Sequence, residues 1–268
     1  MLSNSKNNKI NSFARFLKII SKACLIPHPE KAHFGGEDYY FISKNNTTIG
    51  VADGVGGWAD HPGASSTKYS HDLMNFCNEC SYITDPLLIL QTAYEKLDFS
   101  IKGSTTALVA QVCDKSLHVC NVGDSALSVY RKNKRVFQTT DTLHGFNFPY
   151  QLGSAKRDNP SDGTYDIVPI QPGDVIVAGS DGLWDNVWNN DIEKHIEKVV
   201  IDSNSKHEMM QKLADLLGND AHKNGKDRLF NSPFAQDALN HGYRYIGGKL
   251  DDVTVVASIV VEDEKVNE

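Results

Sequence analysis

Short apolar segments of this chain repeatedly end at an aspartate that lies beside a glycine. The clearest cases are Asp53-Gly54, Gly123-Asp124 and Asp181-Gly182, each at an end of a predicted strand. A carboxylate at the end of a buried strand is unfavourable unless it is paired or bound to a metal ion. An adjacent glycine lets a ligand or a backbone carbonyl approach closely. A single Asp-Gly pair is ordinary turn chemistry, but the repetition predicts strand ends that converge on one acidic site.

Two further acidic corners complete this set. Glu37-Asp38 opens the first predicted strand of the body of the chain, and Asp251-Asp252 starts the last one. Carboxylate oxygens are the hard ligands that Mg²⁺ and Mn²⁺ prefer. Two such ions bridged by one aspartate would hold a hydroxide and clamp a phosphoryl group. The set as a whole therefore predicts a two-metal site for phosphoryl chemistry.

The order of the predicted elements favours an α+β fold, because strands and helices come in runs rather than in strict alternation. Strands are expected at 39–43, 48–52, 105–112, 116–121, 126–131, 134–139, 165–170, 174–180 and 253–261. Helices are expected at 65–82, 86–100, 190–201, 206–217 and 233–241, whereas 141–164 and 218–250 have irregular patterns. The short connections between successive strands predict antiparallel pairing.

Composition excludes several classes of protein. The 268 residues are 40% hydrophobic and 23% charged, which suits a folded domain with a normal core. The net charge of −7 argues against a general nucleic-acid binder. The longest apolar runs are far shorter than the roughly 20 residues that span a membrane. Five scattered cysteines argue against a disulfide scaffold, and Cys77-x-x-Cys80 is best explained as two cysteines on one helix turn.

Residues 1–29 differ from the rest, because they carry five basic side chains and no acidic one. Apolar residues recur there at helical spacing, at Ile10, Phe13, Leu17, Ile20 and Cys24. A basic, serine-containing, acid-free amphipathic helix is typical of a mitochondrial transit peptide. A basic tail or a surface helix is the alternative. The sequence thus predicts a leader over 1–29, a domain over 30–262 and an acidic tail over 263–268.

The acidic motifs, taken together, resemble those of the PPM, or type-2C, metal-dependent protein serine/threonine phosphatases. They run in the family's order from about residue 33 to residue 261: Glu37-Asp38, Asp53-Gly54-x-Gly-Gly, Gly103-Ser104-Thr105-Thr106-Ala107, Gly123-Asp124-Ser125, Asp181-Gly182-Leu183-Trp184-Asp185 and Asp251-Asp252. Three segments have sequences similar to those of the mitochondrial branch of the family: residues 51–58, 232–235 and 247–252. That similarity agrees with the predicted leader.

The resemblance implies a four-layer α/β/β/α sandwich with two central antiparallel sheets and a metal cleft between them. It implies hydrolysis of phosphoserine and phosphothreonine by attack of a metal-bridging hydroxide, with two Mg²⁺ or Mn²⁺ ions and room for a third. The expected partners are phosphoprotein substrates. No nucleic acid and no membrane span are expected, and the chain is expected to be a monomer.

By the family's pattern, five groups would hold the two main ions. Asp53 would bridge both ions. Glu37 and the Gly54 carbonyl would bind one ion, and Asp181 and Asp251 would bind the other. Asp53 and Asp181 are therefore also the expected catalytic positions.

The resemblance gives three more carboxylates a place near the metals. Asp38 would act through water, and Asp124 and Asp185, with Asp181, resemble a weaker third-metal site. The Gly103-Ser104-Thr105 segment is expected to serve packing.

The chain departs from the family's pattern at two positions. Val55 stands where the family usually has a histidine that protonates the leaving alcohol, so His33 or His61 is an alternative proton donor. His33 stands where the family usually has a phosphate-binding arginine, and a neutral imidazole attracts a phosphate dianion less strongly. His33 is therefore the expected phosphate contact, in a weaker form.

Two other functions have different sequence requirements. A phosphatase with an aspartyl nucleophile, of the haloacid-dehalogenase kind, needs Asp-x-Asp after the first strand, and Asp53-Gly54-Val55 lacks the second aspartate. A non-catalytic binding or regulatory domain on the same fold would be expected to have lost carboxylates, and here every main ligand position is filled.

Overall fold

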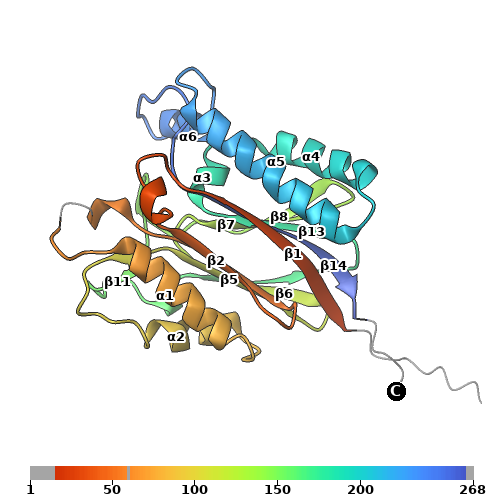
Figure 1. Cartoon of the computed structure of the whole chain (residues 1–268), viewed down its shortest axis with the longest axis horizontal. Coiled ribbons are helices and arrows are strands. Elements are labelled where there is room, and N and C mark those ends of the chain that lie inside the picture. Colours follow the sequence, from red (N-terminus) through yellow and green to blue (C-terminus); the bar gives the residue numbers. More distant parts are fainter. Residues whose placement is uncertain (1–15, 59–60, 264–268) are drawn as a thin grey trace, which may run out of the picture.

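Two facing β-sheets form the centre of the molecule, and helices cover both outer faces (Figure 1). The computed structural model describes residues 16–58 and 61–263. Each central sheet has five strands, and every strand pairs antiparallel to its neighbours. The expected four-layer α/β/β/α sandwich is therefore confirmed.

The two sheets are called the first and the second sheet. In spatial order, the first sheet contains β1 (Leu17–Ile26), β14 (Val253–Glu262), β13 (Val175–Gly179), β7 (Ala126–Arg131) and β8 (Lys134–Gln138). The second sheet contains β12 (Thr164–Pro169), β6 (Ser116–Val122), β5 (Ala107–Cys113), β3 (Thr48–Asp53) and β2 (Asp38–Ile42).

The helices divide between the two outer faces. The second sheet is covered by α1 (Ser66–Glu79) and α2 (Pro86–Tyr94), and the first sheet by α4 (Asn189–Asp202) and α5 (Lys206–Lys226) (Figure 1). Two short helices, α3 (Asp181–Trp184) and α6 (Pro233–Asn240), lie near the ends of the strands of the first sheet.

Polar side chains fix where the covering helices begin. The Ser65 hydroxyl accepts the Lys68 N–H at 3.1 Å, and the Asp85 carboxylate accepts the Leu87 N–H at 2.9 Å. Such caps satisfy N–H groups that have no partner inside the helix. Pro86 fits the first turn of α2, where no N–H donor is needed.

Three buried apolar clusters fill the three spaces between the four layers. Alternation along a strand assigns neighbouring residues to different clusters. Val255 packs with α5, and its neighbour Val256 packs between the sheets. Leu108 likewise lies between the sheets, whereas Val109 packs with α1 and α2. Each sheet is thus apolar on both faces.

The predicted amphipathic helix over 10–24 is wrong for the part that the structure describes. Residues Leu17–Ile26 form β1, an edge strand whose ten residues pair with β14. Leu17 and Ile19 face the space between the sheets, whereas Ile20 and Cys24 face α5. A strand buried on both faces has apolar residues at steps of three and four as well, so the spacing alone did not separate the two structures.

Strand β1 also changes the predicted domain boundary, because it lies inside the sandwich rather than in a separate leader. The rest of the predicted leader, residues 1–15, and nearly all of the acidic tail, residues 264–268, lie outside the described residues. Lys18, one of the basic residues of the predicted leader, pairs with Asp263 at 3.0 Å at the open edge of the sheet.

The segments expected to be irregular contain short elements. Residues 141–164 hold β9 (Leu143–Gly145), β10 (Phe148–Pro149), β11 (Leu152–Gly153) and the 3-10 turn η3 (Pro160–Asp162). Strand β11 pairs with β4 (Ser104–Thr105). Two more 3-10 turns, η1 (Ala32–Phe34) and η2 (Gly56–Trp58), flank the acidic motifs. Among the described residues, no helix is long and apolar enough to cross a membrane.

Candidate active site

A cleft of ≈ 220 Å³ lies where the ends of the two sheets meet, and it collects most of the predicted site residues. Its lining residues are Lys31, Asp53, Gly54, Val55, Gly56, Thr106, Asp124, Asn147, Pro149, Asp181, Lys249 and Asp251. Four carboxylates and two ammonium groups therefore face one small space.

The second sheet supplies one side of the cleft. Asp38 begins β2 and Asp53 ends β3, and the two residues lie directly opposite each other in the antiparallel pair. The Glu37 carbonyl accepts the Gly54 N–H at 3.1 Å, and the Thr106 hydroxyl accepts the Asp53 N–H at 3.1 Å. Ordinary strand pairing thus brings the Glu37-Asp38 and Asp53-Gly54 motifs together.

The first sheet supplies the other side. Asp181 opens the short helix α3 directly after β13, and Asp185 follows one turn later, so both side chains lie on one face of the helix. A Cβ atom at Gly182 would lie 2.0 Å from the Asp252 carbonyl oxygen. Only glycine therefore allows α3 to pack this closely against the strand that carries Asp251.

Burial strongly opposes ionisation of these carboxyl groups. Burial raises the pKa of Asp53 well above its usual range, and the charges of Asp38 and Asp181 act in the same direction. Burial also raises the pKa of Asp124, and it raises the pKa of Asp185 to about 7. This is the electrostatic environment of carboxylates that need a cation to stay ionised together.

The ammonium group of Lys249 lies among three of the carboxylates. Its Nζ atom contacts Asp181, lies 2.9 Å from Asp185 Oδ2 and lies 3.2 Å from Asp251 Oδ2. Burial acts to raise the pKa of Asp181, but Lys249 outweighs it and the pKa is lowered. Lys249 thus provides the positive charge that stabilises the carboxylates on this side of the cleft.

A buried asparagine holds Lys249 in place. The Asn186 side chain accepts the Lys249 N–H at 2.9 Å and donates to the Lys249 carbonyl at 2.7 Å. Glycine precedes the lysine because a Cβ atom at Gly248 would lie 1.9 Å from the Asn224 carbonyl oxygen.

Lys31 plays the equivalent part on the other side of the cleft. Its Nζ atom lies 2.6 Å from Glu37 Oε2, 3.1 Å from Asp252 Oδ2 and 3.9 Å from Asp251 Oδ1. Burial acts to lower the pKa of Lys31, but the neighbouring carboxylates outweigh it and raise the pKa. Lys31 therefore stays positively charged.

The residues fit divalent metal ions in their chemistry. Both oxygens of Asp38 and the Oδ1 atom of Asp181 are buried without a hydrogen bond, so these oxygens lack the partner that a buried carboxylate requires. As they stand, however, no three His, Cys, Asp or Glu side chains of the described residues converge closely enough to hold an ion. Since Lys31 and Lys249 lie between the carboxylates, metal binding requires both ammonium groups to move.

Asp252, to which the family's pattern gave no metal role, has a structural one. It is 2% exposed, and its carboxylate accepts the N–H groups of His28 at 2.7 Å and Glu37 at 3.0 Å, as well as the Lys31 ammonium. Asp251 lines the cleft instead, as strand alternation predicts for one member of the pair.

The predicted phosphate contact, His33, does not line the cleft. It is exposed in η1, its Nδ1 atom lies 3.0 Å from the Glu30 carbonyl oxygen, and its ring contacts Phe34. Lys31, two residues earlier, lines the cleft in its place. Val55 also lines the cleft, whereas His61 packs on Trp58, so neither alternative imidazole is among the cleft residues.

The chain resembles known proteins over most of its length. The family model for protein phosphatase 2C matches residues 90–218. The chain is 42% identical to probable protein phosphatase 2C 80 of Arabidopsis thaliana over 252 residues, covering 91% of this chain and 59% of that protein. It is 35% identical to the protein phosphatase PTC7 homolog of Xenopus laevis, covering 85% of this chain and 82% of the relative.

Solved structures agree with these matches. The X-ray structure of the photosystem II phosphatase PBCP has a TM-score of 0.80 and 32% identity, covering 90% of this chain and 98% of that one. The catalytic domain of the serine/threonine protein phosphatase PstP, in complex with two manganese ions, shares the fold at a TM-score of 0.63 and 17% identity, covering 91% of this chain and 99% of that one.

The relatives differ in length from this chain. It spans 59%, 53% and 43% of three plant relatives, but 82% of the Xenopus laevis protein. The acidic motifs, the sandwich and the similarity across nearly the whole domain lead to one conclusion: the chain belongs to the protein phosphatase 2C family.

Proposed function

We propose that this protein is a metal-dependent protein serine/threonine phosphatase. One observation carries the proposal: carboxylates from both sheets, Asp53 on one side and Asp181 and Asp251 on the other, line one cleft at the sheet edges. Hydrolysis of a phosphate monoester needs concentrated positive charge beside the phosphoryl oxygens. An acidic cleft supplies that charge by binding divalent cations.

The residues take the following parts in this proposal. Asp53, Glu37 and the Gly54 carbonyl would hold one Mg²⁺ or Mn²⁺ ion, and Asp53, Asp181 and Asp251 would hold a second. Bound ions supply the Lewis acidity that activates water for attack on phosphorus.

Three further carboxylates surround these ligands, and one lysine faces the substrate. Asp38 holds an ordered water beside the ligands, and Asp124 and Asp185 extend the acidic surface toward a third ion. Lys31 faces the substrate phosphate. Phosphoproteins are the substrates, and the chain acts as a monomer.

The test is hydrolysis of a phosphothreonine peptide and of p-nitrophenyl phosphate with Mn²⁺ or Mg²⁺. We expect activity with either ion, none with EDTA, and less than about a hundredth of it in Asp53→Asn, since loss of a key electrostatic group costs about 10²–10³-fold. Asp72→Asn removes a half-buried carboxylate of α1 that pairs with Lys68, outside the cleft, and serves as the matched control. Full activity in EDTA would contradict the proposal.

Two alternative functions make different predictions. An aspartyl nucleophile would form a phosphorylated Asp53 that denaturation traps, and no such adduct is expected here because Val55 replaces the required second aspartate. A non-catalytic domain would bind phosphopeptides without hydrolysing them under any metal.

We also propose that the protein is directed to mitochondria by its basic N-terminal segment. The support is the absence of acidic residues from 1–29, whose basic residues Lys6, Lys9 and Arg15 precede β1. The full chain fused at its C-terminus to a fluorescent protein is expected in mitochondria, and the triple change of these residues to glutamate is expected to prevent this. Lys44→Glu, which changes an exposed lysine outside residues 1–29, is the control, and a plastid or diffuse signal from the unmutated fusion would contradict the proposal.

A further inference from the structure

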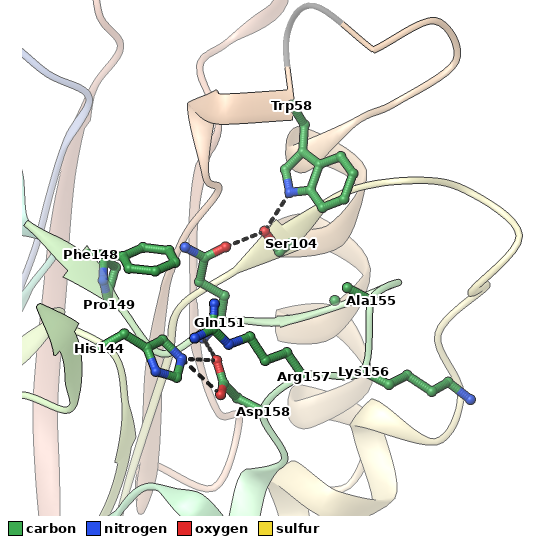
Figure 2. Close-up of a pocket in the computed structure, with 11 residues that line it drawn as sticks. Trp58, Ser104, His144, Phe148, Pro149, Gln151, Ala155, Lys156, Arg157 and Asp158 are labelled. Carbon is green, nitrogen blue, oxygen red and sulfur yellow. Dashed lines mark hydrogen bonds and ion pairs between the residues drawn. The ribbon is translucent and has the colours of Figure 1, made fainter.

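A second pocket lies beside the metal cleft, and no part of the proposed chemistry uses it. This side pocket is a cavity of ≈ 180 Å³. Its apolar walls come from Trp58, Phe148, Pro149 and Ala155 (Figure 2). Phe148 is 44% exposed, and the centre of its ring lies 5.2 Å from that of the His144 ring, so part of the ring faces the open side of the pocket.

Hydrogen bonds between the pocket residues hold the walls in place (Figure 2). The Trp58 Nε1–H donates to Ser104 Oγ at 2.7 Å, and the Ser104 hydroxyl donates to Gln151 Oε1 at 2.8 Å. Below them, the buried Asp158 carboxylate accepts the Gln151 N–H at 2.9 Å and lies 3.0 Å from His144 Nε2. The polar groups satisfy one another, so the surface left for a ligand is mainly apolar and already formed.

The side pocket adjoins the cleft that holds the carboxylates. Pro149 lines both. The Ser104 carbonyl accepts the Val55 N–H at 3.0 Å, and Val55 follows Asp53-Gly54 directly in the chain. A group in the side pocket is therefore held at a fixed position relative to a phosphoryl group in the cleft. Only a residue close in sequence to the phosphorylated one would reach it.

Charge at the rim of the pocket selects against basic groups. Arg157 and Lys156 are exposed, and the Arg157 guanidinium lies 5.3 Å from the centre of the Phe148 ring. Figure 2 shows the Arg157 side chain running toward Gln151, whereas Lys156 extends away from the pocket. A lysine or arginine of a substrate would meet this positive charge, whereas an aliphatic or aromatic side chain would bury the exposed ring.

We propose that the side pocket binds a large apolar side chain of the phosphoprotein substrate, within a few residues of the phosphorylated one. This inference rests on the proposed phosphatase function and adds sequence preference to it. Removal of apolar surface from water stabilises the complex, and a well-shaped apolar pocket discriminates between side chains by about 10–200-fold.

The experiment compares phosphothreonine peptides built on an alanine background. Leucine, or lysine, is placed in turn at each of the three positions on either side of the phosphothreonine, and kcat/KM is measured with Mn²⁺. We expect leucine at one position to raise kcat/KM by about tenfold over alanine, and lysine there to lower it. A leucine scan without any preferred position would overturn the proposal.

Two variants assign the preference to the pocket. Ala155→Phe fills the cavity and Phe148→Ala removes a wall, and both should reduce the leucine preference to less than about twofold. Neither should change hydrolysis of p-nitrophenyl phosphate, which has no flanking residue. Tyr82→Ala, which removes an exposed aromatic side chain elsewhere, is the matched control. A leucine preference that survives in both pocket variants would also overturn the proposal.

A binding measurement separates this inference from the proposed function. The dephosphorylated leucine and alanine peptides, labelled with a fluorophore, are titrated with wild type and Ala155→Phe, and anisotropy is followed. Tighter binding of the leucine peptide to wild type alone supports the pocket even if hydrolysis fails. Equal binding of both peptides by an enzyme that hydrolyses p-nitrophenyl phosphate would reject the pocket and leave the phosphatase function standing.

Discussion

At the scale of single residues, Lys249 is the side chain that most directly limits metal binding. Its ammonium group lies within 3.2 Å of Asp185 and Asp251 and also contacts Asp181. An ion bound by Asp181 and Asp251 would compete with Lys249 for these carboxylates. Lys249 therefore neutralises these carboxylates when no metal ion is bound, and it competes with a metal ion for them.

Lys249→Met should bind Mn²⁺ at least about tenfold more tightly than wild type, a difference of about 1.4 kcal/mol. Without metal, the variant should melt at a lower temperature, because three buried carboxylates lose their cation. Isothermal titration calorimetry with Mn²⁺ at fixed ionic strength measures the affinity of each protein for the ion. Lys134→Met removes a 76% exposed lysine and is the matched control. Weaker Mn²⁺ binding by Lys249→Met would contradict this account.

Lys31 is expected to make the phosphate contact that the sequence motif assigned to His33. Lys31→Met should weaken inhibition by inorganic phosphate by about tenfold, since a hydrogen bond to a charged group contributes about 1.5–3 kcal/mol. Lys31→Arg should retain most of the inhibition by phosphate, and His33→Ala should change the inhibition constant by less than about twofold. A larger loss in His33→Ala than in Lys31→Met would return the role to the histidine.

The carboxylates of the site were predictable from the sequence, but their cations were not. Asp53 and Asp181 stand out because an aspartate beside glycine ends an apolar strand. Nothing local marks Lys31, and the contacts of both lysines depend on how η1 and the loop before β14 fold over the cleft. The Gly247-Gly248-Lys249 tripeptide was the available signal, since the paired glycines indicate close backbone approach.

At the scale of elements, β1 has the largest consequence for stability among the segments that the sequence misassigned. It closes the edge of the first sheet and packs under α5, where Cys24 lies against Gly218. Lysines on an edge strand also prevent pairing with other molecules, which gives Lys18 and Lys22 a structural purpose beside any part in targeting.

Ile19→Ala should lower the free energy of unfolding by about 2–5 kcal/mol, because Ile19 is fully buried between the sheets. Lys22→Ala, in the same strand but half-buried, should lower it by less than about 1 kcal/mol. Urea unfolding followed by circular dichroism measures both. Equal and small effects of the two changes would show that β1 does not belong to the stable core.

Helices and strands were predicted correctly where the apolar residues followed a single helical or strand period. The predictions failed where tertiary packing determined the structure of a segment. Most of the strands and helices were predicted within a few residues of their bounds. The sequence predicts that helix α5 ends at 217, because Gly218 and Gly225 lower the local helix propensity. In the structure α5 continues to Lys226, since tertiary contacts of the buried Ala221 stabilise the extra turns. The short strands β9–β11 have too few residues to show a period.

At the scale of the whole molecule, the cleft joins the two halves of the sandwich. Asp38 and Asp53 belong to the second sheet, whereas Asp181 and Asp251 follow or precede strands of the first. An ion bound by both sets would tie the sheets together at this edge, in addition to the apolar cluster between them.

Metal binding should therefore stabilise the complete fold. At a Mn²⁺ concentration 100 times the dissociation constant, linkage adds about 2.7 kcal/mol, which corresponds to about 5–10 °C in the melting temperature for a protein of this size. Differential scanning calorimetry with Mn²⁺ and with EDTA tests this. Asp53→Asn should lose most of the shift, and the same shift in wild type and variant would show that the ions bind elsewhere.

The position of β14 has a consequence for synthesis. A ribosome delivers residues in order, yet the last strand of the described chain lies between β1 and β13. Until residues 253–262 emerge, β1 lacks its partner β14, and β13 is paired on one side only, with β7. Asp251 emerges at the same late moment. Exposed strand edges in a nascent chain invite aggregation, so the first sheet is most open to pairing with other molecules until residues 253–262 emerge.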